Sequence, residues 1–353
     1  MKRILMATLI GGMLPLTSYA QSTVTLYGDI GGGMRWTNGL KGGAAVGFNN
    51  NIVAGNQFGF FGKEDLGGDL QAIFKLEGAF NSGTGALKNA GTLFSQAAFV
   101  GLKGDFGRLT FGRQLNANED FAILVDPAGG QGQSLAIEPG VVFDANYFTL
   151  DSRFNNTIKY LGQAGGFRFG ASYSPGGVAG NTRAGTNYSG AAMYQWGPAF
   201  GGVSYQKTWN ATATQWAQTF QTGGSVQVGP ARLYLSYADL QVTAANATAP
   251  SRRDHIPGGG VVWVPVASLQ FTAAFYDDIA SHLGNAQSAS GHKITTYAIA
   301  EYFLSKRTEL YAEADYNGFS GAYRFDPSNI AALGTATGTR STTGVSLGVM
   351  TRF

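Results

Sequence analysis

The sequence contains no cysteine, few prolines and few charged residues, and each shortage excludes a class of structure or site. Without cysteine, the chain has no disulfide, thiolate metal site or cysteine nucleophile. Ten prolines among 353 residues are too few for a disordered Pro/Gly-rich chain. Three scattered histidines (His255, His282 and His292) are too few for a typical histidine metal site. A net charge of +3 indicates no nucleic-acid surface. We therefore expect no metal, no cofactor and no nucleic-acid partner.

Glycine and aromatic residues are abundant instead. The chain has 53 glycines, and 13% of its residues are aromatic. A glycine inside a helix costs about 1 kcal/mol relative to alanine, which argues against an all-α fold. Strands that bend, pack closely and end in tight turns use glycine far more readily.

The first 20 residues have the organisation of a secretory signal peptide. Lys2 and Arg3 precede a largely apolar run, and the segment ends in Ser18-Tyr19-Ala20, a small-x-small cleavage site. The alternative is an N-terminal anchor helix, but the run is short for a ~20-residue span and contains Pro15. We expect a signal peptide at residues 1–20 and one membrane domain at residues 21–353.

Long uninterrupted helical spans are also missing after residue 20. The best candidate, residues 258–276, contains three glycines and a proline, and it divides better into two strands around a turn at 265–268. The dominant pattern is alternation. In residues 24–36, Val24, Leu26 and Ile30 share one face, whereas Asp29 and Arg35 share the other.

The alternating segments predict about sixteen strands joined by connectors of two lengths. Short connectors include residues 64–70, 103–107, 163–166, 197–199, 229–231, 265–268 and 305–307, and long ones include 37–55, 115–154, 243–257 and 319–340. The candidate strands are residues 24–36, 56–63, 70–80, 94–103, 108–114, 155–162, 167–174, 188–196, 200–209, 216–228, 231–242, 258–265, 268–279, 293–304, 308–318 and 341–353.

Short turns on one rim and long loops on the other are typical of a bacterial outer-membrane barrel. A membrane offers no water to unpaired backbone groups, so a sheet inside it must close on itself. At about sixteen strands the interior is too wide for side chains to fill, and a water-filled lumen remains. The predicted fold is an all-β, antiparallel transmembrane barrel with short periplasmic turns and long extracellular loops.

Several segments resemble the general porins of β-proteobacteria and Neisseria. They are VTLYG at 24–28, NQFGFFGKEDLG at 56–67, AFVGL at 98–102, FGRLTFGRQ at 106–114, NNTIKY at 155–160 and the final Phe353. The resemblance implies an outer-membrane homotrimer for passive diffusion of ions and small hydrophilic solutes. It also implies that the third extracellular loop folds into the lumen and that the barrel-assembly machinery reads Phe353. Outer-membrane lipid and lipopolysaccharide would surround the barrel.

The third loop is long and acidic. Residues 115–154 separate two strands, and loops of this length are usually functional or disordered. An acidic loop inside a lumen would face basic wall residues and set a transverse field. The alternative is a solvated surface loop. Its acidic residues are Glu119, Asp120, Asp126, Glu138, Asp144 and Asp151.

Strand parity and the resemblance together give a candidate pore wall. Parity puts Arg153 and Lys159 on one face, opposite Ile158 and Tyr160. Gln57 and Gln96 stand where the family often has basic residues, so we expect weak ion preference. The predicted pore-lining residues are Asp29, Arg35, Gln57, Lys75, Glu77, Gln96, Glu119, Asp120, Asp126, Arg153 and Lys159.

Arg113 has the parity of outward Leu109 and Phe111, and the resemblance implies a place at the trimer contact. An arginine facing lipid at mid-depth would otherwise cost about 2–4 kcal/mol.

Catalytic motifs are not evident. Residues 83–88 lack the spacing of a phosphate-binding loop, and no G-x-S-x-G motif with a partnered histidine stands out. The adjacent carboxylates Glu64 and Asp65 fall in a short turn. We therefore expect a channel, not an enzyme. The alternatives are a substrate-selective pore, an outer-membrane barrel enzyme and a soluble secreted β-sandwich.

Overall fold

The computed structural model describes residues 22–130, 136–137, 139–143 and 146–353. The signal peptide predicted at residues 1–20 lies outside the described residues, as do Glu138 and Asp144 of the third loop.

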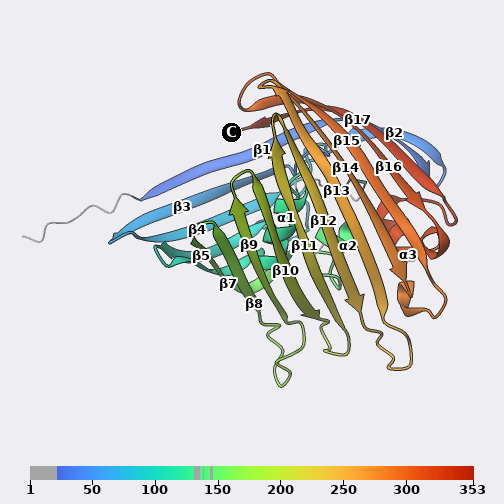
Figure 1. The fold of residues 1–353 in the computed structure, drawn as a ribbon, viewed down its shortest axis with the longest axis horizontal. Helices are drawn as coiled ribbons and strands as arrows, with labels where there is room; N and C mark the ends of the chain where they lie inside the picture. The colour runs from blue at the N-terminus through green and yellow to red at the C-terminus, as the bar shows by residue number, and fades with distance from the viewer. Residues whose placement is uncertain (1–21, 131–135, 138, 144–145) are drawn as a thin grey trace, which may run out of the picture.

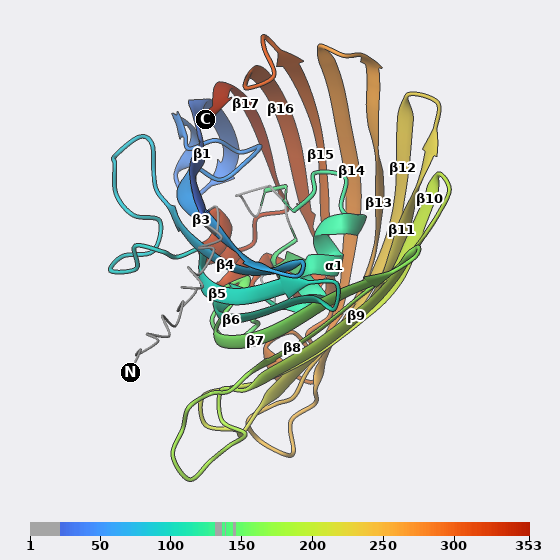
Figure 2. The ribbon, with the colours of Figure 1, turned by 90° about the vertical axis from the view of Figure 1, so that its left-hand side faces the viewer.

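The described residues form one antiparallel sheet that closes into a barrel (Figures 1 and 2). It closes where β1 (Thr23–Leu40) pairs with β17 (Ser341–Arg352), with Asp29 opposite Arg352. The other strands are β2 (Gly43–Asn49), β3 (Gln57–Gly67), β4 (Leu70–Ala79), β5 (Ala97–Gly104), β6 (Gly107–Leu115), β7 (Arg153–Ala164), β8 (Phe167–Ser174), β9 (Asn187–Trp196), β10 (Ala199–Trp209), β11 (Trp216–Val228), β12 (Ala231–Val242), β13 (Arg252–Val266), β14 (Leu269–Ser281), β15 (Gly291–Phe303) and β16 (Thr308–Phe319).

Seventeen strand segments in the described chain make a sixteen-strand barrel, because β2 and β3 share one edge of β1. The first part of β1, from Thr23 to Asp29, pairs with β3. The later part, from Gly33 to Leu40, pairs with β2, which returns along it as a hairpin. The predicted fold and strand number are confirmed. Among the described residues, no helix is long and apolar enough to cross a membrane.

The strand boundaries differ from the sequence prediction in several places, and β3 runs on to Gly67 into the connector expected at 64–70. The expected loop at 37–55 contains the end of β1 and all of β2, since β17 and β2 extend the ladder beyond the barrel rim. The expected loop at 243–257 is shorter, because β13 begins at Arg252, opposite Val242. One strand is shorter than expected, since the strand predicted to start at residue 94 begins at Ala97.

Alternation separates an apolar outer face from a polar inner face. On β1, Val24, Leu26 and Met34 are exposed, as a surface that contacts lipid or another apolar surface must be. Asp29 and Arg35 lie on the other face and make their ion pairs inside the barrel. This ordering keeps these charged groups away from the membrane.

The chain ends and the short turns share one rim. Thr351 is opposite Thr308, beside the short turn from β15 to β16, and the C-terminus lies at this rim (Figure 1). Gly197 and Gly229 lie in two other short turns with φ of +53° and +56°. This backbone region favours glycine, which explains why glycine stands at these two positions.

The third loop, residues 116–152, contains α1 (Ala117–Val125) and α2 (Gly140–Phe143). Both ribbon views show α1 surrounded by the sheet (Figures 1 and 2). The short helices η1 (Leu283–Asn285), η2 (Gly321–Arg324) and α3 (Pro327–Leu333) belong to loops on the opposite rim from the short turns.

Candidate functional site

Asn116 anchors the third loop where it leaves β6. Its side-chain oxygen accepts a hydrogen bond from the Glu119 amide at 2.9 Å and caps α1. Its Nδ2 donates to Gln206 Oε1 on β10 at 2.7 Å. Hydroxyls on neighbouring strands continue the attachment, since Ser189 accepts from the Ala117 amide and Ser204 donates to Asn118. The start of α1 is therefore bonded to the inner wall.

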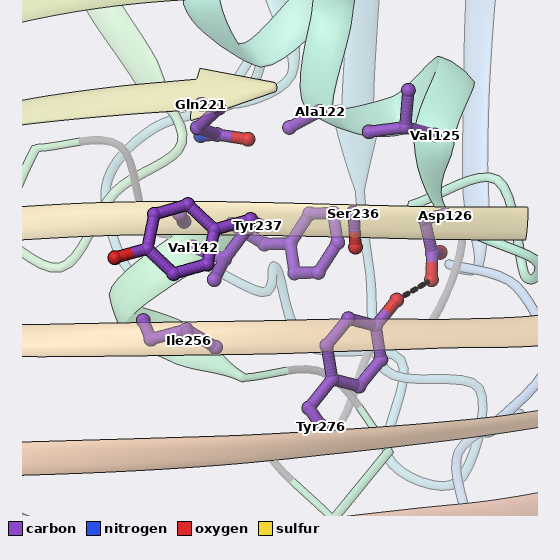
Figure 3. Close-up of a pocket in the computed structure, with 11 residues that line it drawn as sticks. Ala122, Val125, Asp126, Val142, Gln221, Ser236, Tyr237, Ile256 and Tyr276 are labelled. Atoms are coloured by element: carbon purple, nitrogen blue, oxygen red, sulfur yellow. Dashed lines mark hydrogen bonds between the residues drawn. The ribbon is translucent and has the colours of Figure 1, made fainter. Parts of the chain in front are cut away.

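Asp126 attaches the end of α1 to the opposite part of the wall. Tyr276 on β14 donates to Asp126 Oδ1 at 2.5 Å (Figure 3). The Gly130 amide donates to Asp126 Oδ2 at 2.7 Å. Burial raises the pKa of Asp126, and these hydrogen bonds oppose that rise by stabilising the carboxylate. The adjoining cavity is only about 10 Å³, so the loop packs closely on the wall here.

An apolar cluster fills the space between α1, α2 and the wall. Ala122, Val142 and Phe143 come from the third loop, and Ile52 and Val53 come from the first loop. These side chains are nearly fully buried inside the barrel. Burial of apolar surface therefore adds to the polar anchors that hold the third loop. The wall side of the cluster comprises Ala238, Ile256, Ala274, Tyr276, Tyr297, Ile299 and Tyr311.

Lys159 and Asp120 are the predicted wall base and loop acid that the structure brings together. Lys159 Nζ lies 2.7 Å from Asp120 Oδ2, and the lysine side chain is only 5% exposed. Asp120 is 24% exposed, so its charge still faces the lumen. Asp126 accepts hydrogen bonds from Tyr276 and Tyr297, and Glu119 is buried in α1.

Arg35 on β1 lies among two carboxylates of β16. Its guanidinium is 3.0 Å from Glu313 and 2.6 Å from Asp315, and it also donates to Ser346. The two carboxylates are almost completely buried beside it. One guanidinium therefore bridges two neighbouring acidic side chains of β16.

The closing seam of the barrel carries a second mixed-charge group. Arg352 on β17 lies 3.3 Å from Asp29 and 3.2 Å from Glu309. Gln57 donates to Asp29 at 3.0 Å, so the glutamine at a family basic position supports an acidic residue. These contacts link β1, β3, β16 and β17 across the closure.

Lys75 and Glu77 pair with each other along β4, at 2.9 Å. Tyr27 donates to Glu77 at 2.7 Å, and the Lys75 ammonium lies over the Tyr27 ring. Gln96 is buried just before β5, and its backbone N–H donates to the backbone carbonyl of Glu77.

The parity argument for Arg153 is wrong, because a bulge interrupts β7. The register to β6 shifts between Gly112 and Gln114, and Asn156 has a φ of +56°. As a result Phe154, not Arg153, falls in phase with the buried Thr157 and Lys159. The extra residue at the bulge reverses the alternation on one side of it.

Arg113 has a partner within its own chain. Its Nη2 pairs with Asp151 at 2.5 Å, and its other nitrogens donate to the Ser95 carbonyl and to Asn155. It lies on the face opposite the buried Thr110 and Gln114. Asp151 therefore pairs with Arg113 on the outer face of the barrel and does not join the acidic residues in the lumen.

Two larger cavities flank the third loop along the lumen. The cavity toward the short turns measures about 550 Å³ and lies between loop residues such as Pro127 and the wall residues Arg232, Glu301 and Arg352. The cavity toward the long loops measures about 270 Å³ and includes Arg252 and Asp278. The third loop therefore lines both cavities.

Comparison with known proteins identifies the family. A model of the Gram-negative porin family matches residues 7–322. The chain belongs to this family. An outer membrane porin protein of Bordetella pertussis is 30% identical over 375 residues, covering 89% of this chain and 94% of the relative. Outer membrane porin protein 32 of Delftia acidovorans is 27% identical over 348 residues, covering 95% of each.

The fold of the porin matches solved structures as well. The anion-selective porin from Comamonas acidovorans aligns with a TM-score of 0.79 at 22% identity, covering 94% of this chain and 100% of that chain. OmpT of Vibrio cholerae in a trimer form aligns with a TM-score of 0.69 at 14% identity, covering 94% and 99%. With the family established, the protein is an outer-membrane channel through which solutes diffuse passively.

Several lumenal residues of this porin were not among the predicted ones. The acidic residues Glu309, Glu313 and Asp315 of β16 share one face of the strand with Tyr311, and the same alternation that was applied to β1 would have found them. Arg252 on β13 was hidden, since its segment was assigned to a loop. Burial of Ile52 and Val53 has no evident sequence signal.

Proposed function

We propose that this porin is a homotrimeric, weakly selective diffusion channel for ions and small hydrophilic solutes, narrowed by its third loop. The observation that carries the proposal is the attachment of α1 to the inner wall beside the Lys159–Asp120 pair. A loop held by both polar anchors and an apolar cluster occupies lumen that would otherwise be open, and ions must pass its charged edge.

The mixture of basic and acidic side chains in the lumen supports weak selectivity. Among the described residues, the ion pairs of the lumen join five basic to seven acidic side chains, and paired charges partly cancel for a passing ion. The basic residues are Arg35, Lys75, Lys159, Arg252 and Arg352, and the acidic ones are Asp29, Glu77, Asp120, Asp254, Glu309, Glu313 and Asp315. The Comamonas relative is described as anion-selective, and Gln57 and Gln96 support a weaker preference for anions in this chain.

A homotrimer is supported by the outward face of β1, β5 and β6. Leu26, Val100 and Phe111 are exposed there beside Arg113, which is satisfied by its own chain and so needs no contact with water. The Vibrio cholerae relative is described in a trimer form. We also propose outer-membrane lipid and lipopolysaccharide around the remaining outer face, and recognition of Phe353 by the barrel-assembly machinery.

Liposome swelling tests passive diffusion against the alternatives. Liposomes holding the purified protein should swell in neutral sugars at rates that fall smoothly with solute size and do not saturate with concentration. A substrate-selective pore would instead admit one solute with saturation, and a barrel enzyme would give no swelling. A soluble β-sandwich would leave the membrane without detergent.

A further inference from the structure

One side of the barrel is built from a stretch of chain without acidic residues. No aspartate or glutamate occurs between Asp151 and Asp239, and this stretch forms β7 to β11 and most of β12. Among its basic residues, Arg183 and Lys207 make no ion pair within the described structure. Cations that the chain itself does not neutralise favour an anionic partner from outside it.

Arg183 and Lys207 converge on two tryptophans at the rim of the long loops. Trp209 ends β10 and faces Trp216, the first residue of β11, across the ladder. The Lys207 ammonium lies 3.9 Å from the centre of the Trp216 ring and 5.2 Å from that of Trp209. The Arg183 guanidinium, from the loop between β8 and β9, lies 4.8 Å from the Trp209 ring centre. The indole faces therefore hold two cations close together, although like charges repel.

This group of side chains lies on the outer face of the barrel. Lys207 alternates with Gln206 and Thr208, which are almost completely buried, and Gln206 bonds the third loop inside the lumen. Lys207 therefore points away from the lumen. Tryptophans at strand ends are typical of the boundary between membrane and water. The two cations consequently lie at the level of lipid headgroups on the side of the long loops.

The outward neighbours at this level add no acidic charge. Asp239, which lies deeper on β12, is already paired with His255 at 2.9 Å. The glutamines of the row supply neutral hydrogen-bond donors, and its arginine is exposed. The row of cross-strand neighbours that passes through Lys207 comprises Tyr188, Gln218, Gln241 and Arg253.

An apolar groove of about 570 Å³ lies on the same outer face, nearer the short turns. Leu233 and Leu235 line it, and Gly224, the cross-strand neighbour of Leu235, leaves room because it has no side chain. The groove begins at Thr222, which lies about 13 Å along β11 from Gln218 of the basic row. A basic site at headgroup level next to an apolar groove at acyl-chain level matches a phosphorylated lipid.

We propose that Arg183 and Lys207 bind a phosphate of lipopolysaccharide, with an acyl chain of the same molecule in the groove beside Leu235. The guanidinium and the ammonium donate charge-assisted hydrogen bonds to the phosphate oxygens. The inference rests on the proposed function, which surrounds the outer face with lipopolysaccharide, and it deepens that function by assigning a lipid site to one side of the barrel. This side lies away from β1, β5 and β6, where the trimer contact is proposed.

Native mass spectrometry of the purified protein in detergent, freed of endogenous lipid and titrated with lipid A, tests the inference. We expect the parent to retain lipid A. The double variant Arg183→Gln with Lys207→Gln should bind it at least tenfold more weakly, because two charge-assisted hydrogen bonds are lost. Lys207→Arg keeps the charge and should bind like the parent. The matched control is Arg168→Gln, which removes an exposed positive charge from β8 beside the short turn at 163–166 and should leave binding unchanged.

Three further probes distinguish lipopolysaccharide from other sources of phosphate. Inorganic phosphate and the deacylated, phosphorylated disaccharide of lipid A should bind much more weakly than lipid A, because neither occupies the groove. Phosphatidylglycerol should bind more weakly and lose little affinity in the double variant. Equal binding of any of these probes would overturn the assignment to lipopolysaccharide.

Planar-bilayer conductance shows whether each variant is folded, since these residues lie outside the lumen and should leave the current unchanged. A double variant that conducts normally and binds lipid A as tightly as the parent would overturn the inference. So would a parent protein that conducts ions normally but retains no lipid A, a result that leaves the proposed diffusion channel intact. A parent protein that retains lipid A but does not conduct would refute the proposed function instead.

Discussion

Replacing Lys159 by glutamine should shift ion preference toward cations. The Lys159 ammonium is 2.7 Å from Asp120 and almost completely buried, so its removal exposes the charge of Asp120 without changing the backbone. A unit charge about 8 Å from a permeating ion interacts with it by about 0.5 kcal/mol in water, and screening over one Debye length reduces this to about 0.2 kcal/mol. Since the term has opposite sign for the two ions, the cation-to-anion permeability ratio should rise about twofold.

The measurement is the reversal potential of the channel in a planar bilayer under a potassium chloride gradient. Asp120→Asn should shift it toward anions, and the double variant should return close to the parent because the pair is removed as a unit. In molar salt the Debye length falls to about 3 Å and all three differences should shrink. An unchanged reversal potential for Lys159→Gln at low salt would show that this pair does not border the ion path.

Three further predictions concern assembly, the trimer and the third loop. Deleting Phe353 should lower the yield of assembled trimer with little change in single-channel current, because its backbone bonds Gly28 at the closing seam; normal yield would refute this. Arg113→Gln should lower the temperature at which the trimer dissociates in detergent gels, and an unaltered temperature would remove Arg113 from the proposed contact. Burial raises the pKa of Asp126, so attachment of the loop should strengthen as pH falls through that pKa and weaken as pH rises. The current noise of the open channel should therefore be smaller at low pH and larger at high pH. Asp126→Asn should abolish this pH dependence, and a pH dependence that persists in the variant would assign the effect to another group.

The fold was predictable because a barrel in a membrane leaves its pattern in nearly every strand. Alternation located β1 and β4, and the Gly-Pro turns at Gly197 and Gly229 marked the short connections. Prediction failed where pairing continues beyond the rim. β2 has no charged residue and reads as loop, and its place is set by pairing with β1. Single-sequence patterns do not report such tertiary pairing.

The site was predictable only where side-chain parity is unbroken. Arg35 and Lys75 could be assigned by counting along regular strands, and both make ion pairs in the lumen. Arg153 could not, since the bulge at Asn156 adds one residue and reverses the parity. Asp126 could be recognised as acidic, but its tyrosine partners lie on β14 and β15, 150 and 171 residues further along the chain.

Planar-bilayer conductance tests most directly the claim that this protein is a water-filled channel. Purified trimer should insert in steps, each showing three equal conductance levels, and the conductance should rise in proportion to the bulk conductivity of potassium chloride. That proportionality is expected because ions cross in water beside the third loop and do not bind tightly. Absence of conductance steps, or a conductance that saturates at low salt, would contradict the account.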